Sequence, residues 1–292
     1  MGRSANLRGM QATRHGAKRR GGGFFLFFGG GKDPAISQTI FRYITRYSPL
    51  KGGYQRSKNH LNTTVMVMDK INALLALGKE RRESKPPLGS KAIGDFHNGI
   101  YDCKYVSPFT IGAHNENAKI FLLLQDWDSQ DDMNKSEIDP IEQANDLTFG
   151  YDPNQATNKN LAKLLCTHFK HLEIAETYGT NLYPYIKPGA KDNYIPKEDL
   201  LKAANKFALP QIKIVDPKLV VCLGISTFNA VRKACKLKNV NIVEEGIKKP
   251  FSLYNSQVWL QTHPSPQAQN QRGKIKVNED WKRMADWYYS LG

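Results

Sequence analysis

Four runs of apolar residues, separated by helical patterns, constrain the fold more than any other feature of this sequence. The runs are AKIFLLLQD at 118–126, GTNLYPY at 179–185, PKLVVCLG at 217–224 and SQVWLQT at 256–262. Short continuous apolar runs of this kind are typical of strands that are buried on both faces of a parallel sheet. Because helical patterns lie between and after them, we expect an α/β fold, a three-layer α/β/α sandwich around a mainly parallel four-stranded sheet.

The N-terminal part of the chain has a different composition. Its first 32 residues contain seven Lys or Arg and no acid, and the apolar stretch FFLFF between glycines is too short for a membrane span. We predict a disordered, basic, Gly-rich tail at 1–37. An N-terminal helical extension is expected at 38–100, with a helix that ends at Gly78, and the main domain is expected at 101–292.

The overall charge favours a polyanionic partner. Lys and Arg number 42 against 27 Asp and Glu, a net charge of +15, of which the first 32 residues supply seven. Nucleic acid is therefore the first expected partner and an anionic membrane the second. The four cysteines, Cys103, Cys166, Cys222 and Cys235, form no C-x-x-C pair. Their spacing therefore predicts neither a disulfide framework nor a zinc site. It favours reduced thiols in a cytoplasmic protein that is not secreted.

Polar side chains stand at or after the end of each predicted strand. In parallel α/β sheets, ligands bind beyond the carboxyl ends of the strands, which share one edge. We therefore predict that a carboxylate, a carboxamide and an imidazole converge on one site. The residues at the four strand ends are Gln125, Asp126, Trp127 and Asp128, then Asn181, then Ser226, and finally His263 and Ser265.

The stretches LLLQDWDSQ, TNLYP, VVCLGIS and THPSP, in this order, resemble the uracil-DNA glycosylase superfamily. The resemblance covers roughly residues 105–290. It implies an enzyme of base excision repair that flips uracil or a related deaminated base out of single- or double-stranded DNA and removes it by hydrolysis. It also implies a monomeric, nucleoid-associated cytoplasmic protein without metal, cofactor or membrane contact. The iron–sulfur branches of this superfamily need four cysteines with two close together, which these four do not provide, so no cluster is expected.

The resemblance implies a catalytic role for two residues. Asp126 would orient a water beneath C1′ of the sugar and stabilise the positive charge that develops there. A neutral His263 would donate a hydrogen bond to uracil O2 as negative charge builds on the departing base. The two prolines around Ser265 would hold this turn rigid.

Further roles concern binding of the base and of the strand. Asn181 would read the N3–H and O4 edge of uracil, and Gln125 would belong to the same base-binding set. Phe149 is the first candidate for an aromatic platform under the flipped base, and Trp127 is the second. The expected contacts to DNA phosphates are Ser265, Ser226 and Arg272.

Two departures from the best-known branch of the superfamily keep other functions open. This chain has Trp127-Asp128-Ser129 where that branch has Pro-Tyr-His, and Gln267-Ala268 where it has a Leu wedge. The alternative is a catalytically altered member that binds nucleic acid without base release. A third possibility, an esterase that uses Ser226 or Ser265, is disfavoured because the sequence contains no G-x-S-x-G elbow.

Overall fold

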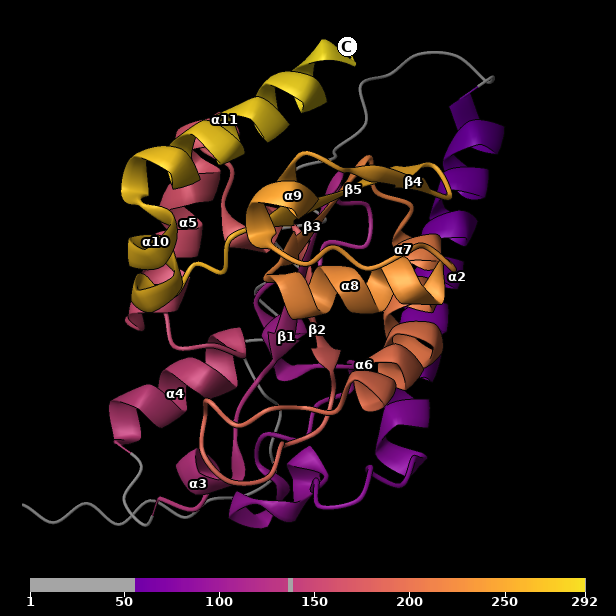
Figure 1. Cartoon of the computed structure of the whole chain (residues 1–292). Helices are drawn as coiled ribbons and strands as arrows, with labels where there is room; N and C mark the ends of the chain where they lie inside the picture. Colours follow the sequence, from indigo (N-terminus) through magenta and orange to yellow (C-terminus); the bar gives the residue numbers. More distant parts are fainter. Residues whose placement is uncertain (1–55, 136–138, 292) are drawn as a thin grey trace, which may run out of the picture. The chain divides into compact units, whose positions relative to one another are not determined.

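The computed structural model describes residues 56–135 and 139–291 (Figure 1). These residues belong to one compact unit, Gln55–Gly292, and the domain boundary predicted after residue 100 falls inside it. The predicted tail at 1–37 lies outside the described residues, as does the extension up to residue 55.

The described chain forms a mixed α/β fold around a mostly parallel sheet with the strand order β2-β1-β3-β5-β4. Strands β1, β2, β3 and β5 are parallel to their neighbours in the sheet and lie at the four predicted positions. Their bounds are Ile120–Asp126 for β1, Tyr178–Tyr183 for β2, Leu219–Leu223 for β3 and Ser256–Gln261 for β5.

The predicted count of four strands is wrong, because the sheet has a fifth strand, β4 (Phe251–Leu253), which pairs antiparallel with β5. A strand of three residues is too short to show an alternating pattern in the sequence. The turn that joins it to β5 also lacks the Asn-Gly or Asp-Gly pair that marks a two-residue hairpin. Instead Tyr254 adopts the left-handed backbone conformation there, with φ 54°.

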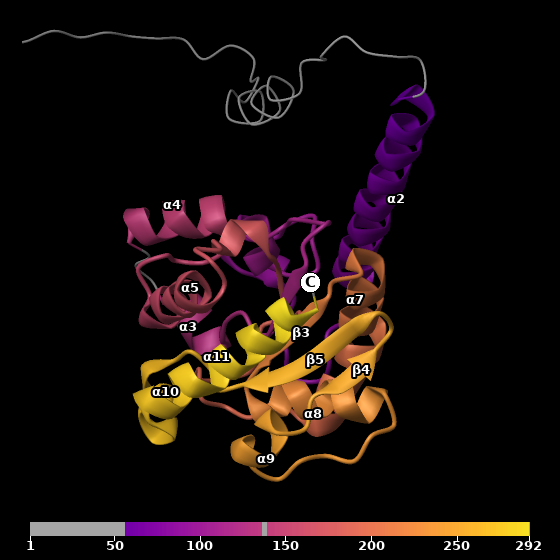
Figure 2. The same cartoon turned by 90° about the horizontal axis from the view of Figure 1, so that it is seen from above.

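Helices pack against both faces of the sheet. One core joins Phe121, Leu123 and Val220 of the sheet to the helices α6 to α8, and the other joins Leu122 and Val221 to α5 and α11. Figure 2 shows α5 and α11 on one side of the sheet and α7 and α8 on the other. The helices are α2 (Arg56–Glu83), α3 (Gln130–Met133), α4 (Pro140–Phe149), α5 (Ala156–His168), α6 (Lys197–Ala203), α7 (Leu209–Val215), α8 (Ile225–Ala234), α9 (Val243–Ile247), α10 (Pro266–Arg272) and α11 (Lys274–Ser290).

The predicted helix end at Gly78 is wrong, because α2 continues through this residue to Glu83. A Cβ atom at Gly78 would lie 1.9 Å from the carbonyl oxygen of Lys104, so glycine is required by close backbone packing rather than by a helix stop. In the next turn, Arg81 donates hydrogen bonds to the carbonyl oxygens of Cys103 (2.8 Å) and Tyr105 (3.1 Å). The end of α2 is therefore fastened to the segment that leads into the sheet.

All four cysteines are free, as predicted. In the part of the chain that the structure describes, no helix is both long enough and apolar enough to cross a membrane.

Candidate active site at the carboxyl edge of the sheet

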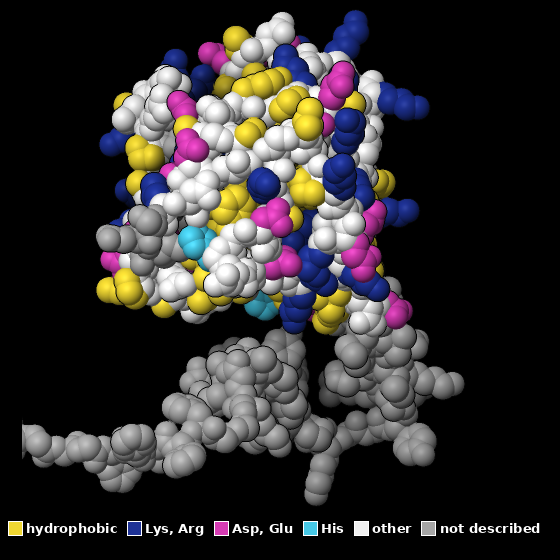
Figure 3. All heavy atoms as spheres, turned by 90° about the horizontal axis from the view of Figure 1, so that it is seen from below, with side chains coloured by type: hydrophobic (Ala, Val, Ile, Leu, Met, Phe, Trp, Pro, Cys, Tyr) yellow, Lys and Arg dark blue, Asp and Glu magenta, His cyan; other side chains and the backbone are white. Residues whose placement is uncertain are grey.

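A cavity of about 180 Å³ opens at the carboxyl ends of β1 and β2. Asp126 is the last residue of β1, two residues after Leu124, and Asn181 on β2 is paired with Leu124. The side chains of Leu124, Asp126 and Asn181 therefore point to the same face of the sheet. His263, from the segment after β5, also lines this cavity. The predicted convergence of a carboxylate, a carboxamide and an imidazole is therefore confirmed. Figure 3 views the molecule from this side, where acidic, basic and histidine side chains are interspersed.

Asp126 is paired with a buried lysine that the sequence analysis missed. The Nζ of Lys187 lies 2.8 Å from Asp126 Oδ2, and the side chains of Lys187 and Asp126 are 4% and 14% exposed. Lys187 also donates to the carbonyl oxygen of Lys191. It reaches the cavity because the segment after β2 runs beside the segment after β1, where the backbone N–H of Gln130 donates to the carbonyl oxygen of Lys187 (2.9 Å). The ammonium group of Lys187 thereby fixes the position of the Asp126 carboxylate at the carboxyl end of β1.

His263 is held as a neutral hydrogen-bond donor. The backbone N–H of Ser265 donates to His263 Nδ1 at 3.2 Å, so in the neutral ring the proton is on Nε2. Burial lowers the pKa of His263 below its ordinary value, and the positive charges of Lys191 and Lys187 act in the same direction, against the opposing effect of Asp126. The turn after β5 thus supplies a neutral imidazole with a fixed tautomer.

Asn181 is fully buried beneath the cavity, with 1% of its surface exposed. The hydroxyl of Ser107 donates to Asn181 Oδ1, which sets the orientation of the carboxamide. Its Nδ2 group remains as a donor, and Oδ1 retains a second lone pair as an acceptor. A rigid amide that presents a donor and an acceptor side by side can read the edge of a base.

The aromatic wall differs from the one predicted. Phe149 is 37% exposed at the end of α4 and does not line the cavity, because Gly150, with φ 68°, turns the chain there. Tyr151 takes that place, with its ring centroid 5.0 Å from that of the buried Phe109. Trp127 does line the cavity, and its Nε1 donates to the carbonyl oxygen of Gly150 at 2.8 Å. Flat apolar surface is thus available from three rings.

The cavity also contains three acidic side chains besides Asp126, namely Asp128, Asp146 and Asp152. Burial raises the pKa of Asp128 to about 6, although the backbone N–H of Ser129 donates to its Oδ1. Burial, reinforced by the charges of Asp152 and Asp128, also raises the pKa of Asp146 to about 6. Asp128 and Asp146 are therefore about half protonated near pH 6 and mostly charged at pH 7.

The predicted phosphate contacts do not form one cluster. Ser265 caps α10, where its Oγ accepts from the N–H of Ala268 at 3.4 Å. Arg272 is bound to Asp280 at 2.9 Å and to Glu244 at 3.4 Å, so its charge is already neutralised. Ser226 lines a different cavity, between α6 and α8.

The predicted base-binding role of Gln125 and the alternative of a serine esterase can also be compared with the structure. Gln125 lies outside the cavity wall, and its Nε2 donates to Asp126 Oδ1 at 3.2 Å. In the described part of the chain, neither Ser226 nor Ser265 has its hydroxyl bonded to a histidine, as a serine hydrolase would need. Within residues 69–135 and 139–291, no group of three His, Cys, Asp or Glu is arranged to hold a metal ion.

The residues that sequence reasoning missed come from loops. Lys187 and Lys191 follow β2, and Tyr151 and Asp152 lie in the loop between α4 and α5, whereas Asp146 lies on α4 itself. The only sequence signal for these residues is that, in parallel α/β folds, the segments that follow the carboxyl ends of the strands line the binding site.

Compared with known protein families and with curated proteins, the chain matches none of them.

Proposed function

We propose that this protein is a DNA glycosylase that flips uracil, or a related deaminated base, out of DNA and removes it by hydrolysis. The observation that carries the proposal is the meeting of Asp126, Asn181 and a neutral His263 in one cavity. These three residues also belong to the sequence stretches that resemble uracil-DNA glycosylases.

In this reaction, the extruded base enters the cavity against the rings of Tyr151 and Phe109, and its polar edge meets the carboxamide of Asn181. The bond between C1′ and the base nitrogen breaks, and its electron pair leaves with the base. Asp126 stabilises the positive charge on the sugar and orients the water that adds to C1′. Water supplies a hydroxyl to the sugar and a proton that finally neutralises the base.

The neutral imidazole suits the departing base. His263 Nε2–H donates a hydrogen bond to the base oxygen on which negative charge develops. Removal of one such donor typically lowers the rate about 10²- to 10³-fold. Lys187 acts beside it, because its ammonium group holds Asp126 in place.

One observation favours a second candidate function, nucleic-acid binding without base release. The carboxyls of Asp128, Asp146 and Asp152 share the cavity, and ionised carboxylates there would oppose a base that leaves as an anion. The glycosylase proposal therefore requires few of these carboxyls to be charged during cleavage, and the pKa values of about 6 allow Asp128 and Asp146 to be uncharged below that pH.

The test is incubation of excess protein with labelled oligonucleotides that carry one uracil, hypoxanthine, xanthine or thymine, followed by hot alkali. Cleavage at uracil that is lost in Asp126→Asn is the expected result. Tight binding with no cleavage at any of the bases, at pH 5.5 as well as at pH 7.5, would replace the glycosylase proposal with the binding-only function.

A further inference from the structure

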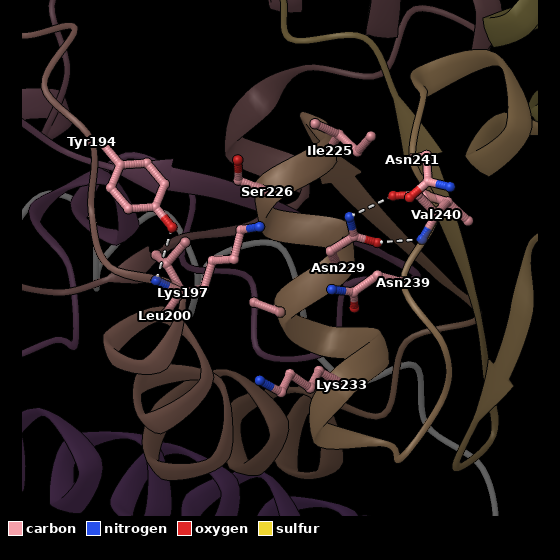
Figure 4. A pocket seen from close by; sticks show the side chains of 11 residues that line it. Tyr194, Lys197, Leu200, Ile225, Ser226, Asn229, Lys233, Asn239, Val240 and Asn241 are labelled. Carbon is pink, nitrogen blue, oxygen red and sulfur yellow. Dashed lines mark hydrogen bonds between the residues drawn. The ribbon is translucent and has the colours of Figure 1, made fainter.

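A second cavity, of about 290 Å³, lies between the start of α6 and the side of α8 (Figure 4). Its lining contains two lysines, Lys197 and Lys233, and no carboxylate. The ring of Tyr194 and the amides of Asn239 and Asn241 complete the polar wall. This combination of cations, amides and one aromatic ring differs from the acidic lining of the catalytic cavity.

The wall of this second cavity is held in place by hydrogen bonds of its own. The carboxamide of Asn229 donates to the carbonyl oxygen of Val240 and accepts from its N–H, both at 2.9 Å. On the opposite side, the backbone N–H of Lys197 donates to the hydroxyl of Tyr194 at 3.2 Å. Tyr194 is 63% exposed, so one large ring surface is open to a ligand.

The two lysines are available for an anion. Within residues 69–135 and 139–291, the ammonium groups of Lys197 and Lys233 have no hydrogen-bond or ion-pair partner. The neighbouring Lys202 is instead bound to Asp199 at 3.4 Å. Figure 4 shows the side chain of Lys197 extending toward Ser226 at the start of α8. Two unpaired cations in a hollow without acids favour a phosphate group.

Segments of the chain that border the catalytic cavity run on to border the second cavity. The segment after β2 supplies Lys187 and Lys191 to the catalytic cavity, and then Tyr194 and Lys197 to the second. At the end of β3, a Cβ atom on Gly224 would lie 3.9 Å from the Cβ of His263, and α8 begins at the next residue. The two cavities are therefore bordered by neighbouring segments of the chain.

We propose that the second cavity binds a neighbouring nucleotide of the DNA strand whose damaged base enters the catalytic cavity. Its phosphate is held by Lys197 and Lys233, and its base lies against Tyr194 within reach of the amides of Asn239 and Asn241. The proposal rests on the proposed function in taking DNA as the ligand, but it concerns binding of a nucleotide that is not cleaved.

The probe is a short fluorescein-labelled oligothymidylate without uracil, whose affinity is measured by fluorescence anisotropy over a range of salt concentrations. Lys197→Ala should reduce the slope of log affinity against log salt by about 0.7, the value for one phosphate contact on a single strand. Tyr194→Ala should weaken binding about ten-fold with an unchanged slope, because stacking involves no counterion.

The matched control is Lys119→Ala. Lys119 is exposed and precedes β1, at the opposite edge of the sheet, so its loss removes one positive charge away from both cavities. Lys119→Ala should leave both affinity and slope near the wild-type values. If Lys197→Ala and Tyr194→Ala behave like this control, the proposed nucleotide site is refuted.

Base release measured on the same variants separates this proposal from the proposed function. If the wild type releases no base while Lys197 and Tyr194 still govern oligothymidylate binding, the second site stands and the glycosylase function fails. If release is normal and binding is unchanged in the variants, the second site alone fails. If Lys197 governs binding of thymidine monophosphate but not of the oligonucleotide, a free-nucleotide site replaces the strand site.

Discussion

Replacement of Lys187 by methionine tests the buried ion pair of Asp126, the carboxylate that we propose acts in catalysis. The variant keeps a side chain of similar length and removes only the ammonium group, which lies 2.8 Å from Asp126 Oδ2. Both partners are largely buried, with side chains 4% and 14% exposed. Removal of one partner of a buried pair costs about 3–5 kcal/mol of unfolding free energy, because the remaining charge is left without compensation. Since Asp126 borders a cavity that admits water, we expect the lower end, about 3 kcal/mol.

The assay is urea unfolding followed by circular dichroism at pH 8. Lys202→Met is the matched control, because its pair with Asp199 is longer, at 3.4 Å, and the lysine side chain is 74% exposed. An exposed pair of this kind contributes less than about 0.5 kcal/mol. The double variant Lys187→Met with Asp126→Asn should recover most of the loss, because it leaves no unpaired charge. Equal losses of unfolding free energy in Lys187→Met and Lys202→Met would show that the buried pair of Lys187 and Asp126 contributes no more than an exposed one.

Three further predictions concern the buried carboxyls of the cavity and the packing of Gly78. Because burial raises the pKa of Asp128 and Asp146 to about 6, their uncharged forms dominate below that pH, and uracil release should fall as the pH rises through about 6. Because the folded-state pKa of Asp128 is raised from 3.8 to about 6, Asp128→Asn should be more stable than the wild type at pH 8 and should lose part of this advantage at pH 5, which lies between the two values. Thermal melts at both pH values test this, and an equal difference in stability between variant and wild type at pH 8 and pH 5 would contradict it. Gly78→Ala, which would normally stabilise a helix by about 1 kcal/mol, should instead destabilise the fold by about 1–3 kcal/mol in urea unfolding, because the new Cβ would lie 1.9 Å from Lys104 O. A stabilised variant would show that this packing is absent.

The sequence predicts the parallel part of the sheet well, because β1, β2, β3 and β5 are largely buried on both faces and therefore rich in apolar residues. It fails at β4, where three residues form a strand only because the edge of β5 offers hydrogen bonds. It fails again at Gly78, where the same residue that often ends a helix serves close packing with a distant backbone segment.

In the candidate site, residues on strands could likewise be predicted from the sequence, whereas residues on loops could not. Asp126, Asn181 and His263 stand on or directly after strands, so their meeting follows from parallel order alone. Lys187 and Tyr151 reach the cavity through loops whose paths no periodicity reports. Arg272 was expected at a phosphate, but its partner Asp280 on α11 is visible only in three dimensions.

Mass spectrometry of the free base released from a uracil-containing oligonucleotide tests directly whether Asp126 and a neutral His263 cleave a base from DNA. We expect the wild type to release uracil at pH 5.5, Asp126→Asn to release none above background, and His263→Ala to act about 10²- to 10³-fold more slowly. Uracil release by Asp126→Asn at the wild-type rate would contradict the mechanism. The absence of free base from the wild-type reaction, with the protein in excess, would contradict the function itself.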